Sequence, residues 1–307
     1  LGVEVREMLL RAFKTAPLKS LVLMNNNMGR DVIEFAVNAL KRNATLECID
    51  FRNNLIESEN DVISLMTTVN EHPEVDTLIF VECGIGKNDA VMKCIVSGLS
   101  NLIEVSFDDN HVGSYGARLI AKCLASNPGI KVLNLRDNLF NDKDATWLAA
   151  GLKRNTNLLK LRLTGNQITR VGVDALFTAI FNLSSVDAVY DSNHTCWVDA
   201  GHGVLPKHNT RLAPKFNRNV KFLIILTCYH NGIAGNLNLN NVPVKLMPRV
   251  LAFIQEIVAE QYRLNETYSL IRQWNMPLLY TAESLHKLRR SERIWKKRVM
   301  ELMAKAK

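Results

Sequence analysis

The sequence lacks long apolar runs and is poor in the residues that mark irregular chains. It contains only 8 prolines and 15 glycines among 307 residues, which excludes a collagen-like or low-complexity chain. The strongest apolar run, residues 222–226, is far shorter than the ~18 consecutive apolar residues of a transmembrane helix. Because 47% of the residues are apolar and 22% are charged, we expect a soluble globular protein with a long continuous core.

Cysteine is scarce as well, and its spacing argues against a disulfide scaffold. The six cysteines are Cys48, Cys83, Cys94, Cys123, Cys196 and Cys228. None of the short paired spacings of a disulfide-rich domain is present, so we expect reduced thiols. Reduced thiols favour an intracellular compartment, either the cytoplasm or an organelle such as a plastid.

Sequence motifs of the common catalytic sites are also missing. The chain contains no G-x-x-x-x-G-K-[ST], G-x-S-x-G, G-x-G-x-x-G or H-E-x-x-H pattern. We therefore expect a protein that is not an enzyme, with no catalytic residues and no cofactor.

A regular repeat dominates what the sequence does contain. Asparagine or cysteine recurs every 27 to 29 residues, at Asn26, Asn54, Cys83, Asn110, Asn138, Asn166 and Asn193. Before each of the first six lies a frame of three apolar residues, the second and third being three and five positions after the first. The frames are Leu18/Leu21/Leu23, Leu46/Ile49/Phe51, Val75/Leu78/Phe80, Leu102/Val105/Phe107, Ile130/Leu133/Leu135 and Leu158/Leu161/Leu163.

Each part of the repeat has a physical cause. The frame alternates apolar and polar residues, as a strand with one buried face does. The asparagine follows three residues later, where its amide can pair with backbone groups of neighbouring repeats. Apolar residues spaced by four then predict a helix, for example one that begins near Ser114 and buries Ile120 and Leu124.

The pattern L-x-x-L-x-L-x-x-N/C over about residues 17–195 is that of a leucine-rich repeat. Its length resembles the ribonuclease-inhibitor-like subfamily. The resemblance implies an α/β fold, a curved right-handed solenoid with an inner parallel sheet and outer helices, followed by an α-helical C-terminal extension. The alternative is an α/β sandwich with a parallel sheet.

We divide the chain into four parts. Residues 1–16 are predicted to form an N-terminal capping helix, and residues 17–196 six clear repeats and one degenerate repeat, with a strand at 185–190. Residues 197–280 are predicted to form a loop and a helical cap, because the last repeat needs its apolar edge covered. Residues 281–307 are predicted to form a basic amphipathic helix.

A second resemblance lies in the C-terminal part. The segments 192–196 (SNHTC), 244–255 (VKLMPRVLAFIQ) and 276–277 (MP) resemble a family of leucine-rich repeat proteins of unicellular algae with secondary plastids. The resemblance implies an architecture and a lineage, and it supplies no catalytic residues.

The C-terminal helix carries most of the net charge. Residues 281–307 contain nine basic and three acidic residues, +6 of the net +8 of the chain. Such a helix docks on an acidic protein surface, RNA or anionic lipid, or else is a solvated cap helix. The predicted partner-docking residues are Arg289, Arg290, Arg293, Trp295, Lys296, Lys297 and Arg298.

The second candidate site is the inner face of the strands. Its predicted protein-binding residues are Ile79, Val81, Glu104, Asp108, Asn134, Arg136, Lys160 and Arg162. They form an apolar, an acidic and a basic patch in that order. Apolar residues amid mixed charge favour a protein partner over nucleic acid, which requires one sign of charge.

Four potential metal ligands lie close together near the end of the repeats, at His194, Cys196, His202 and His208. Their spacing matches none of the usual zinc pairings, so we expect them to pack a loop and predict no metal site.

The sequence favours a non-catalytic scaffold or adaptor that binds one or more proteins, such as a subunit of a large organellar assembly. One alternative is an RNA- or ribosome-associated factor that uses the basic tail. The other is a regulator of a small GTPase, which would act through a loop arginine. Arg30, Arg52 and Arg136 are equally well explained as surface charge.

Overall fold

The computed structural model describes residues 3–25, 31–182, 184, 186–201, 209, 217, 218 and 221. The chain divides into two compact units, Leu1–Lys221 and Phe222–Lys307. The helices predicted after residue 221 and the basic tail therefore lie outside the described residues.

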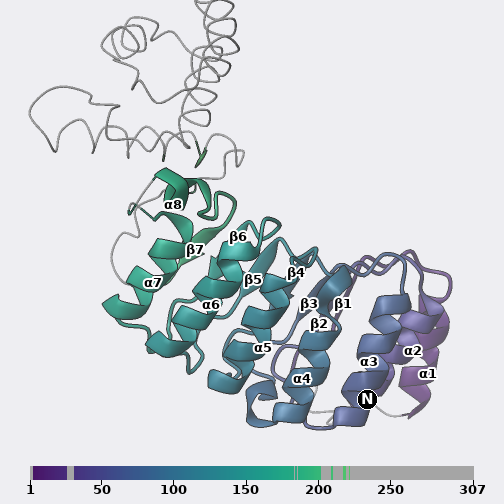
Figure 1. Ribbon diagram of the computed structural model, residues 1–307. Coiled ribbons are helices and arrows are strands. Elements are labelled where there is room, and N and C mark those ends of the chain that lie inside the picture. The colour runs from purple at the N-terminus through teal and green to yellow at the C-terminus, as the bar shows by residue number, and fades with distance from the viewer. Residues whose placement is uncertain are drawn as a thin grey trace, which may run out of the picture. The chain divides into compact units, whose positions relative to one another are not determined.

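The first unit is built on one parallel sheet whose strands follow the order of the chain (Figure 1). Its strands are β1 (Ser20–Val22), β2 (Cys48–Asp50), β3 (Thr77–Ile79), β4 (Glu104–Ser106), β5 (Val132–Asn134), β6 (Lys160–Arg162) and β7 (Trp197–Asp199). Each strand is three residues long and pairs in register with the next, and the frame spacing predicts this register for β1 to β6.

Helices connect the strands and form a second layer along the sheet (Figure 1). They are α1 (Val3–Phe13), α2 (Asp31–Arg42), α3 (Glu59–Glu71), α4 (Asp89–Ser97), α5 (Ser114–Ala125), α6 (Asp142–Arg154), α7 (Arg170–Ile180) and α8 (Val186–Tyr190), with short 3-10 helices η1 (Ile85–Lys87) and η2 (Leu99–Asn101). The strand–helix alternation with all strands parallel confirms the predicted α/β repeat solenoid. None of the helices in the described part combines the length and the apolar content needed to cross a bilayer.

The core lies between the two layers and consists of the predicted frames. Every frame residue except Leu18 is buried, and Leu18 packs against the core while partly exposed. Phe51, Phe80 and Phe107 occupy the third frame position of successive repeats and stack, with ring centroids 5.3 and 6.1 Å apart. The repeats are therefore held in register by apolar contacts between equivalent positions.

The ladder after the strands is confirmed from Asn54 to Asn166, while Asn26 lies outside the described residues. The side-chain nitrogen of Asn138 donates to the carbonyl of Phe107 one repeat earlier at 2.8 Å. Its oxygen accepts from the backbone nitrogen of Val112 at 2.9 Å. Cys83 replaces asparagine by donating its thiol to the carbonyl of Phe51 at 3.2 Å. Burial raises the pKa of the Cys83 thiol to about 12, so it stays protonated and remains a donor.

The seventh repeat differs from the prediction. The segment predicted as its strand forms helix α8, and the strand is β7, which lies later in the chain. Asn193 does not belong to the ladder after the strands, because its amide donates to the carbonyls of Leu152 at 2.8 Å and Asn155 at 2.6 Å. Its oxygen accepts from the backbone of Cys196, so the residue closes the turn that leads into a strand.

Asn193 therefore repeats the role of Asn155 and not that of Asn166. The amide of Asn155 donates to the carbonyl of Leu124 at 3.0 Å, and its oxygen accepts from the backbone of Leu158 at 2.7 Å. Both asparagines follow a helix and precede a strand. The interval of 27 residues from Asn166 to Asn193 in the sequence matched the repeat period by coincidence.

Candidate functional site on the strand face

Register pairing sorts the outward side chains of the sheet into columns that run across the repeats. The first column contains Ser20, Cys48, Thr77, Glu104, Val132, Lys160 and Trp197. The second contains Val22, Asp50, Ile79, Ser106, Asn134, Arg162 and Asp199. Two residues further along each chain segment lie Met24, Arg52, Val81, Asp108, Arg136 and Thr164. We call this surface the strand face.

In the half of the strand face formed by β4 to β7, charged side chains are joined by polar contacts. Asn134 links two of them: its amide nitrogen lies 3.4 Å from an oxygen of Glu104, and its oxygen accepts from Arg162 at 2.8 Å. Asn134 itself is only 5% exposed. Its role is therefore to hold an acidic and a basic neighbour in place, and a partner would meet those neighbours instead.

A second polar group crosses the same half. A carboxylate oxygen of Asp108 accepts from the backbone nitrogen of Arg136 at 2.8 Å. The guanidinium of Arg136 reaches past β6 to Asp199, with an N–O distance of 3.4 Å. Burial raises the pKa of Asp108, and its hydrogen bond with Arg136 and the charges of Arg136 and Arg162 oppose that rise.

Lys160 and Trp197 form the last contact of this half. The ammonium of Lys160 lies 5.4 Å from the centre of the Trp197 ring, a cation–π geometry. Trp197 precedes Asp199 by two residues on β7, so the seventh strand supplies both an aromatic and an acidic side chain to the strand face.

The other half, formed by β1 to β3, contains the exposed apolar side chains. Val22 is 57% exposed and Met24 is 45% exposed. Ile79 and Val81, the predicted apolar patch, are half-buried. Between the two pairs lie Asp50 and Arg52, whose carboxylate and guanidinium are 3.3 Å apart.

The predicted strand-face residues thus fall into two groups. The structure brings Glu104, Asn134 and Arg162 together, and it places Asp108 against Arg136. The sequence analysis missed Asp199 and Trp197, because it assigned the seventh strand to the wrong segment. It also gave no weight to Val22 and Met24, although both stand at the same frame positions as Ile79 and Val81.

A further regularity lies at the turn after each strand. The residue before each ladder position adopts a left-handed backbone conformation, with φ between 53° and 77° in the six repeats. These residues are Asn25, Asn53, Glu82, Asp109, Asp137 and Gly165. Asparagine, aspartate and glycine tolerate this conformation best, so their recurrence is a signal that sequence reasoning could have used.

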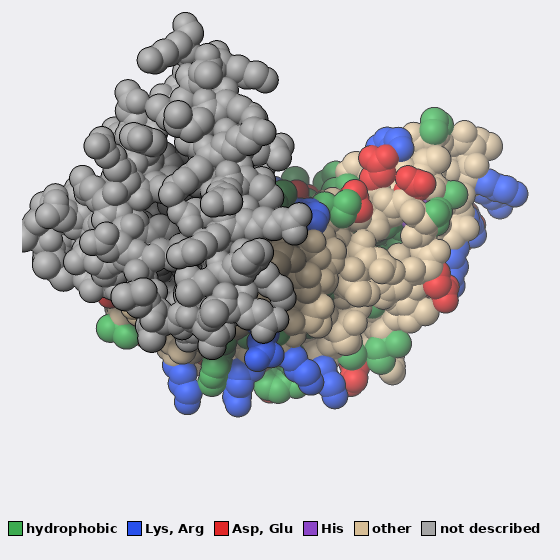
Figure 2. Space-filling model, turned by 45° about the horizontal axis from the view of Figure 1, so that its top comes forward, with side chains coloured by type: hydrophobic (Ala, Val, Ile, Leu, Met, Phe, Trp, Pro, Cys, Tyr) green, Lys and Arg blue, Asp and Glu red, His purple; other side chains and the backbone are tan. Residues whose placement is uncertain are grey.

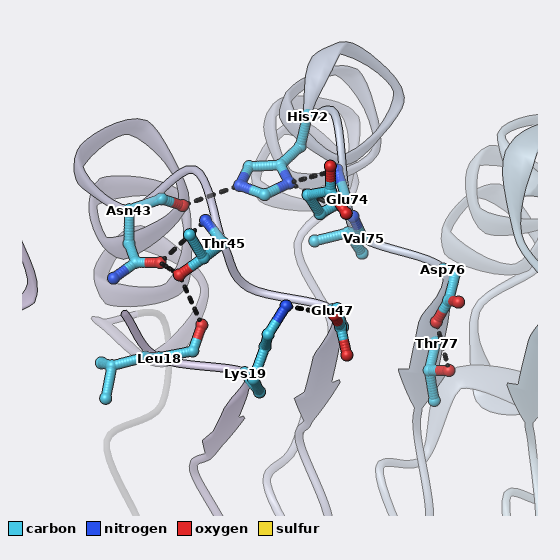
Figure 3. A network of polar contacts seen from close by, with 10 residues as sticks. All are labelled: Leu18, Lys19, Asn43, Thr45, Glu47, His72, Glu74, Val75, Asp76 and Thr77. Carbon is cyan, nitrogen blue, oxygen red and sulfur yellow. Dashed lines mark hydrogen bonds and ion pairs between the residues drawn. The ribbon is translucent and has the colours of Figure 1, made fainter. Parts of the chain in front are cut away.

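The opposite end of the strands is organised by a polar network (Figure 3). His72 accepts at Nδ1 from the backbone of Val75 at 3.2 Å, and its Nε2 lies 2.7 Å from the carbonyl of Asn43. The side chain of Asn43 in turn donates to the carbonyl of Ala16 at 2.7 Å and accepts from Thr45. Asn43 and His72 stand three residues before their frames, as Asn155 does, so they close the turns that lead into β2 and β3.

The candidate metal ligands are not assembled into a site in the described residues. His194 lies 3.4 Å from the ammonium of Lys221, and Cys196 is buried and has its thiol pKa raised by burial. No group of three or more potential ligands occurs in the part of the chain that the structure describes, and His202 and His208 lie outside it. Cys48, Cys83, Cys94, Cys123 and Cys196 are free thiols.

Lys221 is fully buried against residues at the end of the repeats. Its ammonium donates to the carbonyls of Ile180 at 2.6 Å and Asn193 at 2.8 Å. Burial lowers the pKa of Lys221 to about 7. Burial and the charge of Lys221 lower the pKa of His194 to about 4.

The docking residues predicted on the basic tail, Arg289 to Arg298, lie outside the described residues.

The family comparison agrees with the repeat architecture. Residues 154–177 match the family model of the leucine-rich repeat. No curated protein sequence matches the chain. The solved structure titled "Leiomodin-1 Actin-Binding Site 2 (ABS2)" is similar with a TM-score of 0.34 and 12% identity, over 72% of this chain and 96% of that chain. The tropomodulin C-terminal domain of Caenorhabditis elegans has a TM-score of 0.35 and 10% identity, over 66% of this chain and 99% of that chain.

Residues 154–177 thus match the leucine-rich repeat, and the seven parallel strands in chain order are the arrangement expected of stacked repeats of this kind. The two structural similarities are too weak to carry an argument about a partner.

Proposed function

We propose that this protein is a non-catalytic scaffold that binds a partner protein on the strand face. The observation that carries the proposal is the exposure of Val22 and Met24, 57% and 45%, on the outward face of the first repeat. Apolar side chains exposed together favour a protein contact, and methionine is enriched in such interfaces. Solenoid proteins commonly use their extended repeat surface for binding.

The charges of the strand face support a protein partner over a nucleic acid. Asp50 pairs with Arg52, and Asp199 pairs with Arg136, so acidic and basic groups alternate. A phosphate backbone would be repelled by the acidic members of these pairs. A protein partner with its own mixed charges can match them, and such matching determines orientation and specificity more than affinity.

The two halves of the strand face then have different roles. The apolar half around Val22 and Met24 supplies buried area. The polar half orients the partner through Glu104, Asp108 and Lys160, which are half-buried and held by neighbouring side chains.

Two of the three arginines considered for a regulator of a small GTPase are paired within this chain. Such a regulator needs an arginine that is free to enter the active site of its partner. Arg52 and Arg136 are each committed to an aspartate of this chain. Arg30 lies outside the described residues.

The test is an affinity purification from the native source with Val22→Glu/Met24→Glu. Both side chains point outward, so the variant should fold and melt as the wild type does. It should lose the partner proteins that the wild type retains, because two carboxylates would have to be desolvated in the interface.

The matched control is Val171→Glu. Val171 is 69% exposed and lies on α7, in the helix layer. This variant introduces a carboxylate at another exposed apolar position and should retain the same partners. If the strand-face variant and the control retain the same proteins in equal yield, the strand face is not the binding surface.

A further inference from the structure

The charges of the helix layer are distributed differently from those of the strand face. Figure 2 shows Lys and Arg side chains gathered along the lower margin of the described part, where acidic side chains are few. Helices α5 and α6 contain five basic residues, and all five are exposed. They are Arg118, Lys122, Lys143, Lys153 and Arg154, which we call the basic platform.

The two acidic residues of these helices offset only part of this charge, and five basic against two acidic residues leave +3 (5 − 2). Asp144 is fully buried and accepts from the backbone of Asn141 at 3.0 Å in the capping box of α6. Asp142 accepts from the hydroxyl of Thr169 at 2.7 Å and from the backbone of Gly172 at 3.0 Å. Its hydrogen bond with Thr169 lowers the pKa of Asp142. Both carboxylates are thus committed to backbone and hydroxyl groups at helix starts.

Trp147 joins the two helices at the centre of the platform. The guanidinium carbon of Arg118 on α5 lies 4.9 Å from the centre of the Trp147 ring, and the ammonium of Lys143 on α6 lies 5.3 Å from it. Two cations on one ring are at most about 10 Å apart, which is roughly one Debye length at physiological salt. They repel each other, and an anion close to both of them would relieve that repulsion.

Interaction with the helix dipole explains the positions of only some of the five basic residues. Lys122, Lys153 and Arg154 lie in the last turns of their helices, where a cation interacts favourably with the helix dipole. Lys143 lies in the first turn of α6, where the dipole disfavours a cation. Arg118 lies in the middle of α5. Stability of the helices therefore does not explain the two cations at Trp147.

The helices next to the platform carry no such excess of charge: α4 contains Asp89 and Lys93, and α7 contains Arg170 and Asp174. Helix α3 contains Glu59, Asp61 and Glu71 and no basic residue. The positive charge is therefore local to α5 and α6 and does not follow from the net charge of the chain alone.

We propose that the basic platform binds the phosphate backbone of a single-stranded RNA. All five cations are exposed, whereas Asp144 is buried and Asp142 is partly buried, so positive charge predominates on α5 and α6, as a phosphate site requires. A protein partner is less well matched, because the centre of a protein interface is depleted of charges and the platform has few exposed apolar side chains. This surface is separate from the strand face, so the two proposals can fail independently.

The test uses the full chain and a fluorescein-labelled oligouridine RNA of about 20 nucleotides, with binding followed by fluorescence anisotropy at several salt concentrations. Arg118→Gln/Lys143→Gln/Arg154→Gln should weaken binding about tenfold or more and should reduce the salt dependence, log K against log salt, by about 2, because three phosphate contacts are lost. Circular dichroism and the melting temperature should match those of the wild type.

The control Lys14→Gln/Lys41→Gln/Lys87→Gln removes the same charge from three exposed residues elsewhere. It should weaken binding less than about twofold. Both variants are also measured in a background in which Arg293, Lys296, Lys297 and Arg298 are replaced by Gln. RNA binding by the basic tail then cannot hide a loss of affinity at the platform. Equal affinity of the platform variant and its control in that background would overturn the proposal. So would platform-dependent binding of a polyglutamate peptide without binding of RNA, which would assign the platform to an acidic protein.

Discussion

Gly151 on α6 lies directly against the backbone of Ala121 on α5. A Cβ atom built on Gly151 would be 2.4 Å from the carbonyl oxygen of Ala121, closer than any real contact of this kind. The close approach requires glycine although alanine has the higher helix propensity. The requirement for glycine at position 151 cannot be deduced from the sequence, because it depends on the distance between the two helices.

Gly151→Ala should therefore destabilise the protein. The gain in helix propensity of up to about 1 kcal/mol is opposed by an overpacking cost of about 1–3 kcal/mol, because α5 and α6 must separate. Thermal and urea unfolding measure the difference. Gly113→Ala is the control, since a Cβ there meets nothing within 4 Å, and it should leave the melting temperature almost unchanged.

Leu161→Ala tests the core assignment. Leu161 is 0% exposed, so its truncation should lower the free energy of unfolding by about 2–5 kcal/mol. Leu159 lies two residues earlier and is 50% exposed, so Leu159→Ala should cost no more than about 0.5 kcal/mol. Equal effects in urea unfolding would mean that Leu161 is not a core residue.

His72 performs the task that asparagine performs in other repeats. Its ring connects the carbonyl of Asn43 with the backbone nitrogen of Val75. His72→Leu would leave both backbone groups without their partner and should cost about 1–3 kcal/mol in unfolding experiments. His72→Asn should recover much of that loss, because asparagine makes the equivalent bonds at position 155. Similar melting temperatures for the two variants would refute the assigned role.

His194 should make the folded state sensitive to mild acid. Burial lowers its pKa from 6.5 to about 4, so the unfolded chain binds a proton that the folded chain excludes. The folded state should therefore lose stability as the pH falls from about 6.5 towards 4, by roughly 1–3 kcal/mol. His194→Gln should remove this component. The measurement is the change in urea-unfolding free energy between about pH 7.5 and pH 5 in both proteins; an equal change would contradict the prediction.

Much of the fold could be predicted from local patterns. The alternation in each frame determined which residues are buried, as Leu133 and Leu161 at 1% and 0% exposure show. The predicted start of α5 near Ser114 is confirmed. Alternation and helical spacing are properties of adjacent residues, so the sequence states them directly.

The candidate site was less predictable, because its contacts join residues that are far apart in the chain. Arg136 and Asp199 are 63 positions apart and meet only because β7 pairs next to β6. Misassignment of that strand removed Trp197 and Asp199 from the predicted surface. Val22 is exposed, whereas Ile79 at the equivalent position is half-buried. Both are β-branched apolar residues, so the residue type does not predict this difference.

The sequence by itself determined the period, the buried positions and the ladder that asparagine and cysteine form after the strands. Only the tertiary structure decided that Asn193 belongs with Asn155, that Gly151 must lack a side chain, and that Arg118 and Lys143 meet at Trp147. The physical reason is that a repeat pattern specifies how each unit folds. The contacts between units depend on how closely equivalent backbones approach when they stack, and that distance is not encoded in any single repeat.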